Sequence, residues 1–221
     1  MFGIKKLLFG NGPNENLPAD VRAVLDHWQK NQAAPLESSH FLTRYVVIDI
    51  ATEGNTDEEK QLVGIAASVM HQGVISPEES IYVDLLASTA DPDAVDRQLA
   101  AFLLFVGKSP LVAYHVAFAN EYLQQILKAR LGIAFSPRWV DLAWLLPAMF
   151  SDISHKPLPL DEWLLAFGLD VGTGRRSVME NTLLLGRLLQ MLVVKAHGKG
   201  VDTVGSLIDE SKASNYLRRT H

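Results

Sequence analysis

The chain alternates between short runs of apolar, largely β-branched residues and longer segments in which apolar residues recur every three or four positions. The short runs are typical of strands, and the longer segments are typical of helices that pack one face against a core. The predicted strands are residues 45–50, 62–71, 80–85, 111–114 and 140–142. The predicted helices are residues 18–31, 91–106, 118–131, 160–167, 177–196 and 201–218, with a further apolar segment at 143–150.

The order of these elements predicts the fold class. A polar loop from Thr52 to Lys60 separates the first two strands, and Gly73 and Pro77 lie between the second and the third, which is typical of an antiparallel meander. Helices and strands then alternate, and this order favours parallel pairing. We therefore expect an α/β domain of ribonuclease H type, a mixed β-sheet flanked by α-helices. The strand ends should bring Asp49, Tyr114 and Asp141 to one edge, where ligands of open α/β sheets bind.

Several helix ends carry recognisable signals. Gly132 follows the predicted helix 118–131 and should end it in the left-handed conformation. Ser177 and Glu180 have the spacing of a capping box at the start of the long apolar helix. Asp91, with a proline after it, is the expected N-cap of the helix 91–106.

The pattern divides the chain into three parts. Residues 1–40 form a helical extension, residues 41–197 form the α/β domain, and residues 198–221 form a helix packed on that domain. The last helix is amphipathic, so it could pack within the chain or form a homodimer. Its apolar side carries Val201, Val204, Leu207 and Ile208.

Composition narrows the class of partner. A hydrophobic share of 48% across 221 residues suffices for a large core, and the formal charge of −5 gives no global basic surface. Contact with nucleic acid would therefore need a local patch. The chain has no cysteine, which excludes disulfides and thiolate metal sites and suits a reducing compartment. No stretch approaches the roughly 18 to 20 apolar residues of a membrane span, so we expect a cytoplasmic protein with no membrane partner.

Three segments, in order, carry a family resemblance. Residues 46–54 read VVIDIATEG, residues 111–119 read LVAYHVAFA, and residues 176–181 read RSVMEN. They resemble the three motifs of the DEDD 3′–5′ exonucleases of the DEDDh type, the family of ribonuclease T and the proofreading subunit of bacterial DNA polymerase III. Asp141, in WVDLA, resembles the family's additional strand end, although it is also a plausible helix cap. The resemblance covers about residues 41–195.

The catalytic positions depart from the family. The resemblance implies four carboxylates and a general-base histidine that serve two Mg²⁺ or Mn²⁺ ions. Ala51 stands in place of the glutamate, Ala119 in place of the second aspartate, and Arg176 in place of the histidine. Asn181 replaces the last aspartate, and Asp49 alone is kept. One carboxylate cannot offset the charge of two divalent cations, and arginine cannot accept a proton from water.

These losses favour a pseudoenzyme without a cofactor. The leading hypothesis is a catalytically silent exonuclease-fold protein that binds single-stranded nucleic acid, a nucleotide or a protein partner. The first alternative is an active metal-dependent exonuclease, with Mg²⁺ or Mn²⁺ held by Asp49 and displaced carboxylates such as Glu53, Glu121 or Glu180. The second alternative is an adaptor that binds proteins through the terminal segments.

Candidate ligand-binding residues come from the motifs. They are Ile50, Thr52, His115, Phe118, Arg175 and Arg176. The two arginines precede a helix and could cradle a phosphate, but a solvated pair is the simpler interpretation. His115 also fits a surface turn, and Phe118 fits a core position at helical spacing from Tyr122.

Overall fold

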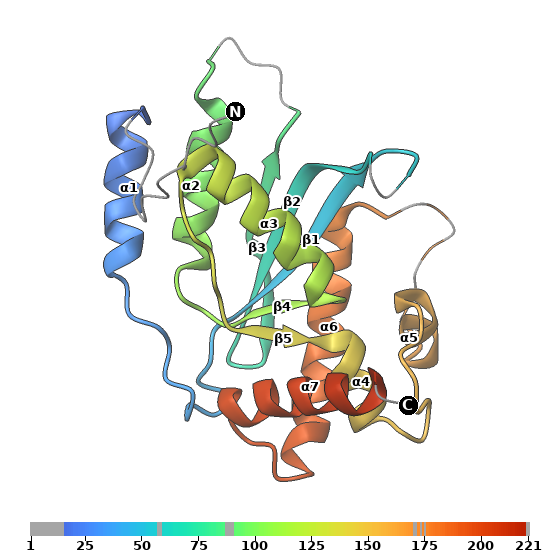
Figure 1. Cartoon of the computed structure of the whole chain (residues 1–221). Helices are drawn as coiled ribbons and strands as arrows, with labels where there is room; N and C mark the ends of the chain where they lie inside the picture. The colour runs from blue at the N-terminus through green and yellow to red at the C-terminus, as the bar shows by residue number, and fades with distance from the viewer. Residues whose placement is uncertain are drawn as a thin grey trace, which may run out of the picture.

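The computed structural model describes residues 16–56, 59–86, 91–169, 172, 174 and 176–219, and in these a five-stranded sheet forms the centre. Its order is β3-β2-β1-β4-β5 (Figure 1). The strands are β1 Tyr45–Glu53, β2 Gln61–His71, β3 Val74–Asp84, β4 Leu111–Ala113 and β5 Trp139–Asp141. The first three pair antiparallel, whereas β4 and β5 run parallel to β1. The predicted mixed sheet with an initial meander is confirmed.

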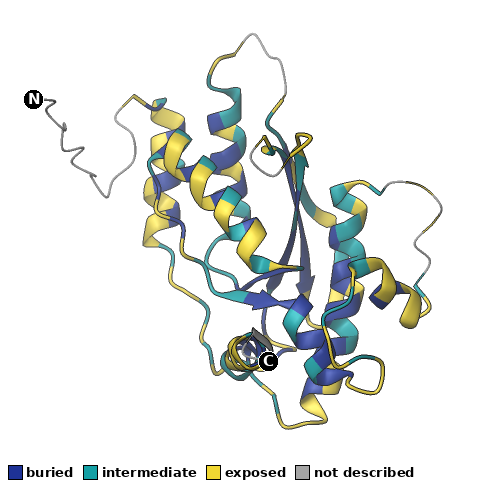
Figure 2. Cartoon of the chain, turned by 45° about the vertical axis from the view of Figure 1, so that its right-hand side comes forward, coloured by how far each residue is buried: buried dark blue, intermediate teal, exposed yellow. Residues whose placement is uncertain are grey.

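Helices cover both faces of this sheet, as the buried strands in Figure 2 show. The helices are α1 Ala19–Lys30, α2 Ala94–Val106, α3 Val116–Leu131, α4 Leu142–Met149, α5 Leu160–Ala166, α6 Val178–His197 and α7 Val204–Arg219. Helices α2 and α3 contact the sheet on one face, with α1 packed outside α2, and α6 contacts β1, β2 and β3 on the other. None of the helices in these described ranges is long and apolar enough to cross a membrane.

The alternation of side chains along β1 separates two cores. Val46 and Ile48 belong to the core under α1, α2 and α3, whereas Tyr45 and Val47 belong to the core under α4, α6 and α7. Successive strand residues point to opposite faces, so Asp49 shares the α6 face with Tyr45 and Val47. The strand pattern therefore decides which helix Asp49 meets.

Strands β1 and β3 are longer than the sequence indicated. β1 continues to Glu53, beyond the predicted end at residue 50, because its last residues still pair with β2. β3 begins at Val74, six residues before the predicted start. Pro77 and the glutamates beside it hid this strand, but β3 lies at the sheet edge and its pairing shifts register there, where proline is tolerated.

The helix-end predictions had mixed outcomes. Gly132 adopts the left-handed conformation and its N–H bonds back to the α3 carbonyls, as expected. The Ser177–Glu180 capping box is also confirmed. The prediction for Asp91 was wrong: α2 is preceded by Asp93 at the N-cap, and the Asp91 carboxylate instead accepts the Asp93 N–H at 3.0 Å. The aspartate turn ahead of the helix displaces its start by three residues.

The two terminal helices are part of the packed structure. Helix α7 buries Val204, Leu207 and Ile208 in the second core, beside α4 and β5, which selects packing within the chain for this face. Helix α1 buries Val21, Leu25 and Trp28 in the first core. The domain boundaries at residues 40 and 197 remain predictions, and residues 1–15 lie outside the described part of the chain.

A buried histidine links the segment before β1 to the start of α7. One ring nitrogen of His40 lies 2.7 Å from the Tyr45 hydroxyl, and the other lies 2.9 Å from the Val201 carbonyl oxygen. A neutral ring satisfies both contacts, because Nε2–H donates to the carbonyl while Nδ1 accepts from the tyrosine. Burial lowers the pKa of His40, since it penalises the charged ring.

Because of this link, we expect the free energy of unfolding to decrease as the pH decreases. The unfolded chain takes up a proton on His40 near its ordinary pKa of about 6.5, whereas the folded chain does so only at lower pH. Urea midpoints should therefore decrease as the pH falls from about 7.5 to about 5.5. The decrease should be smaller in His40→Asn than in His27→Asn, a matched change at an exposed site in α1. Equal decreases in both variants would contradict this role.

Candidate functional site

Asp49 is held by an amide from the opposite helix. Its Oδ2 accepts the side-chain N–H of Asn181, in the first turn of α6, at 2.9 Å. The carboxyl group is largely enclosed between β1 and α6, and burial raises its pKa. The Asn181 hydrogen bond and the nearby Arg176 charge act in the opposite direction, because both favour the carboxylate.

The hydrogen bonds continue from Asn181 to a third element. The Asn181 carbonyl oxygen accepts from Arg176 Nε at 2.9 Å, and the Arg176 guanidinium also donates to Asp161 at the start of α5. One amide therefore serves an acid on one side and a cation on the other. The Arg176 side chain is only 16% exposed, so the prediction of a solvated arginine was wrong for this residue. Arg175 lies outside the described residues.

These groups line a pocket of about 750 Å³ at the end of the sheet. Its walls are a β1 segment, the start of α6, Tyr82 from β3 and the first turn of α5. Of the residues predicted to bind a ligand, the structure gathers three around Asp49. They are Ile50, Thr52 and Arg176.

The residues around Asp49 do not fit a pair of divalent cations. Ala51 contributes a methyl group to the pocket, and Ala119 is 3% exposed in the core beneath α3. Asn181 presents an N–H donor, not an oxygen, to Asp49, and a guanidinium lies next to it. Within the described ranges, no three His, Asp or Glu side chains gather in a way that could hold a metal ion.

The neighbouring acids point elsewhere. Glu53 is exposed at the end of β1, and Glu121 is exposed on α3, where it accepts a hydrogen bond from Gln125. Glu180 closes the capping box, and the Ser177 N–H lowers the pKa of its carboxyl group. The Glu180 carboxylate already occupies the N-terminus of α6. This helix start therefore has little capacity left to bind a phosphate beside Arg176.

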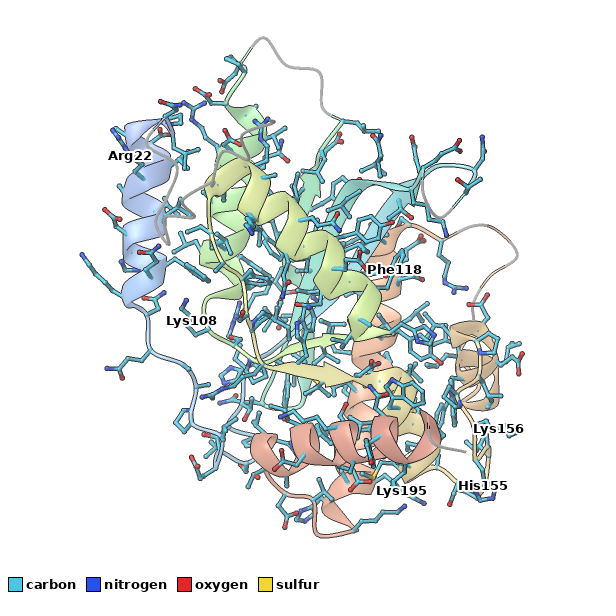
Figure 3. All side chains as sticks on the ribbon, in the orientation of Figure 1. Arg22, Lys108, Phe118, His155, Lys156 and Lys195 are labelled. Atoms are coloured by element: carbon cyan, nitrogen blue, oxygen red, sulfur yellow. The ribbon has the colours of Figure 1, made fainter. Side chains whose placement is uncertain are left out.

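The other candidate residues lie away from Asp49. His115 lines a different cavity, beside β5 and α7. Phe118, at the first turn of α3 (Figure 3), is 41% exposed and packs edge-on against Tyr122 at 4.9 Å between ring centroids. The expectation that Phe118 belongs to the core was therefore wrong, because the buried stripe of α3 runs through Ala119, Leu123 and Leu127 and leaves position 118 beside it.

Asp161 and Tyr82 are among the pocket residues that sequence reasoning did not assign to the site. No sequence pattern pointed to Asp161. It belongs to the short helix α5, 15 residues before its partner Arg176. Tyr82 had one indirect signal, the glycine at position 64 within the predicted strand 62–71. A Cβ at Gly64 would stand 2.5 Å from the Tyr82 hydroxyl, so the missing side chain makes room for the phenol ring.

Asp141 is a structural acid that serves two helices. Its Oδ1 accepts the N–H groups of His115 and Ala143, both at 3.1 Å, and its Oδ2 accepts that of Val116 at 3.0 Å. The predicted cap of α4 is thus confirmed, and the same side chain also holds the start of α3. Burial raises the pKa of Asp141, while the three backbone donors act against that rise.

We expect Asp141→Ala to lower the free energy of unfolding by about 2–4 kcal/mol, because it leaves several buried N–H groups without an acceptor. Asp141→Asn should cost less, since the amide oxygen still accepts. Urea unfolding measures both, and Asp209→Ala, at an exposed position in α7, is the control. A loss no larger than in the control would contradict the double cap.

No protein-family profile and no curated protein matches this sequence. Among solved structures, the chain is similar to the nuclease domain of 3′hExo, a DEDDh family member bound to rAMP. The TM-score is 0.56 at 12% identity, over 71% of this chain and 94% of that domain. It is also similar to E. coli Exonuclease I in complex with a dT13 oligonucleotide. The TM-score is 0.52 at 12% identity, over 70% of this chain and 42% of that enzyme. The resemblance drawn from the motifs is confirmed at the level of the fold: this chain has the ribonuclease H-like fold of DEDDh exonuclease domains.

Proposed function

We propose that this chain is an exonuclease-fold protein that does not cleave phosphodiesters by the two-metal route and that uses the Asp49 pocket to bind a nucleotide or the end of a single strand. The observation that carries the proposal is the Asn181 amide, which donates to Asp49 at 2.9 Å and accepts from Arg176 at 2.9 Å. The Asp49 carboxylate, which would have to bind cations in an active enzyme, already accepts a hydrogen bond from the protein.

Charge supports the inactive assignment. Two divalent cations carry about +4, and active relatives offset this with several carboxylates. The charged residues lining this pocket are Asp49, Asp161 and Arg176, which sum to −1 within the described part of the chain. Arg176 also stands at the general-base position, and a guanidinium does not take a proton from water near neutral pH.

The binding assignment depends on the shape and lining of the pocket. A volume of about 750 Å³ suits a nucleotide, and the similar solved structures contain rAMP and a dT13 oligonucleotide. Tyr82 offers an aromatic surface and Thr52 a hydroxyl. Because Asp161 neutralises Arg176, phosphate attraction contributes less than the sequence suggested, and contacts to base and sugar contribute more. Affinity should therefore depend only weakly on salt.

The alternative of an active nuclease requires displaced ligands. Glu53 and Glu121 are exposed, and neither lines the pocket of Asp49. Glu180 is engaged by Ser177. Their positions favour the inactive protein.

Labelled single-stranded DNA and RNA should stay intact with this protein in Mg²⁺ or Mn²⁺, and the same oligonucleotides should bind in EDTA. Gel analysis measures cleavage and fluorescence anisotropy measures binding. Thr52→Trp, which fills the pocket from β1, should weaken binding by about tenfold, a loss of about 1.4 kcal/mol.

Two outcomes would contradict the proposal. If the protein cleaves oligonucleotides with metal ions and Asp49→Ala abolishes this cleavage, the protein is an active nuclease. If it binds oligonucleotides in EDTA no more strongly than an unrelated acidic protein does, the proposed ligand is wrong. Gln125→Trp, at an exposed position on α3, is the control for Thr52→Trp.

Asn181→Asp tests the amide directly. A second carboxylate would face Asp49 in place of a donor, and we expect unfolding near pH 7 to become easier by about 1–3 kcal/mol. The loss should shrink near pH 5, because the close pair then holds a proton in the folded state. Millimolar Mn²⁺ should raise the melting temperature of this variant more than that of wild type or of the Asn31→Asp control. Equal shifts in all three would contradict the role given to Asn181.

A further inference from the structure

A second cavity, of about 560 Å³, lies on the other side of the parallel strands from the Asp49 pocket. It opens between the edge strand β5, the first turn of α3 and helix α7, which lies beside β5 in Figure 1. It shares no lining residue with the Asp49 pocket. Its lining follows the open edge of β5 from Trp139 to Asp141 and includes His115 and Val116, which follow β4 in the chain.

The wall of this cavity is aromatic and held in place. Trp139 and Trp144 line it, together with Ile208 from α7. The Trp139 indole N–H donates to the Asn120 side chain at 2.9 Å, which holds the ring without a ligand. Two indoles on neighbouring elements form a surface suited to a flat ring.

The buried hydroxyl group of Ser211 gives the cavity a hydrogen-bonding group. Ser211 on α7 is 5% exposed, and its oxygen accepts the Asp141 N–H from the open edge of β5 at 3.2 Å. Its own proton has no acceptor among the groups that the structure describes, and Ser211 lines the cavity. It can therefore donate to a ligand.

His115 has a strained backbone at the same cavity. Its φ of 62° lies in the left-handed region, uncommon for a residue other than glycine. Asp141 holds its N–H, and its ring packs edge-on against Tyr114 at 4.8 Å. Strain of this kind persists where surrounding contacts enforce it, and it is frequent at ligand sites.

We infer that this cavity binds a nucleobase. The lining cations Arg138 and Lys212 are balanced by Asp141 and Asp209, so the site favours a neutral ligand. A nucleobase is flat and presents donors and acceptors in one plane, which matches indole walls beside the Ser211 hydroxyl. The base belongs either to a free nucleoside or to a nucleic-acid strand. This inference does not depend on the Asp49 pocket.

Equilibrium dialysis of the full chain against labelled adenosine, a short single-stranded oligonucleotide and ribose tests the inference. Ala117→Trp fills the cavity from an exposed position on α3, and Ala129→Trp makes the same change elsewhere on that helix. We expect Ala117→Trp to weaken binding by about tenfold and Ala129→Trp to leave it within about twofold. Ser211→Ala, a smaller change, should weaken binding by about threefold, and it keeps the test decisive if Ala117→Trp does not fold.

The ligand arms identify the source of the base. Adenosine binding that is sensitive to the two cavity variants identifies a nucleoside site, and sensitivity confined to the oligonucleotide identifies a base of a strand. Binding of both probes that is unchanged in Ser211→Ala and Ala117→Trp would overturn the inference. So would ribose binding as tightly as adenosine, or no binding of either base-containing probe.

Discussion

A carboxylate enclosed between a strand and a helix must receive compensating groups, and at Asp49 these are the Asn181 amide, a backbone hydrogen bond from Ile50 and the nearby Arg176 charge. Asn181 donates to Asp49 and accepts from Arg176, which is paired with Asp161. This chain of contacts joins β1, the start of α6 and the start of α5. The walls formed by β1, the start of α6 and the start of α5 each carry one of the connected groups, whereas Tyr82 from β3 forms a wall outside this chain of contacts.

The substituted motif positions make physical sense as a set. An acid at position 181 would face Asp49 with like charge unless cations lay between them, whereas asparagine removes that requirement. Arg176 then meets a neutral oxygen and an exposed carboxylate instead of a metal cluster. These contacts fit the proposed inactive protein, because protein groups hold both Asp49 and Arg176.

Asp141 also receives compensating donors at the end of β5, two strands away from β1. Its carboxylate satisfies the first N–H groups of α3 and α4, and its own backbone N–H reaches Ser211 on α7. A C-terminal helix is thereby joined to the open edge of the sheet. The second cavity lies at this junction, so it exists only because α7 packs there.

The sequence alone determined the order of strands and helices and the helix ends at Gly132 and Ser177, and it placed Ala51, Ala119 and Asn181 at the positions where the family resemblance implies acids. Those features are local, since side-chain periodicity and caps act over a few residues. Tertiary structure decided the early start of β3, the pairing of Asp161 with Arg176, and the linkage of His40 to Val201, 161 residues away. It also decided that α7 closes a cavity against β5. Contacts of this kind depend on strand register and on how helices pack across a sheet, and neither is encoded in the pattern of any one segment.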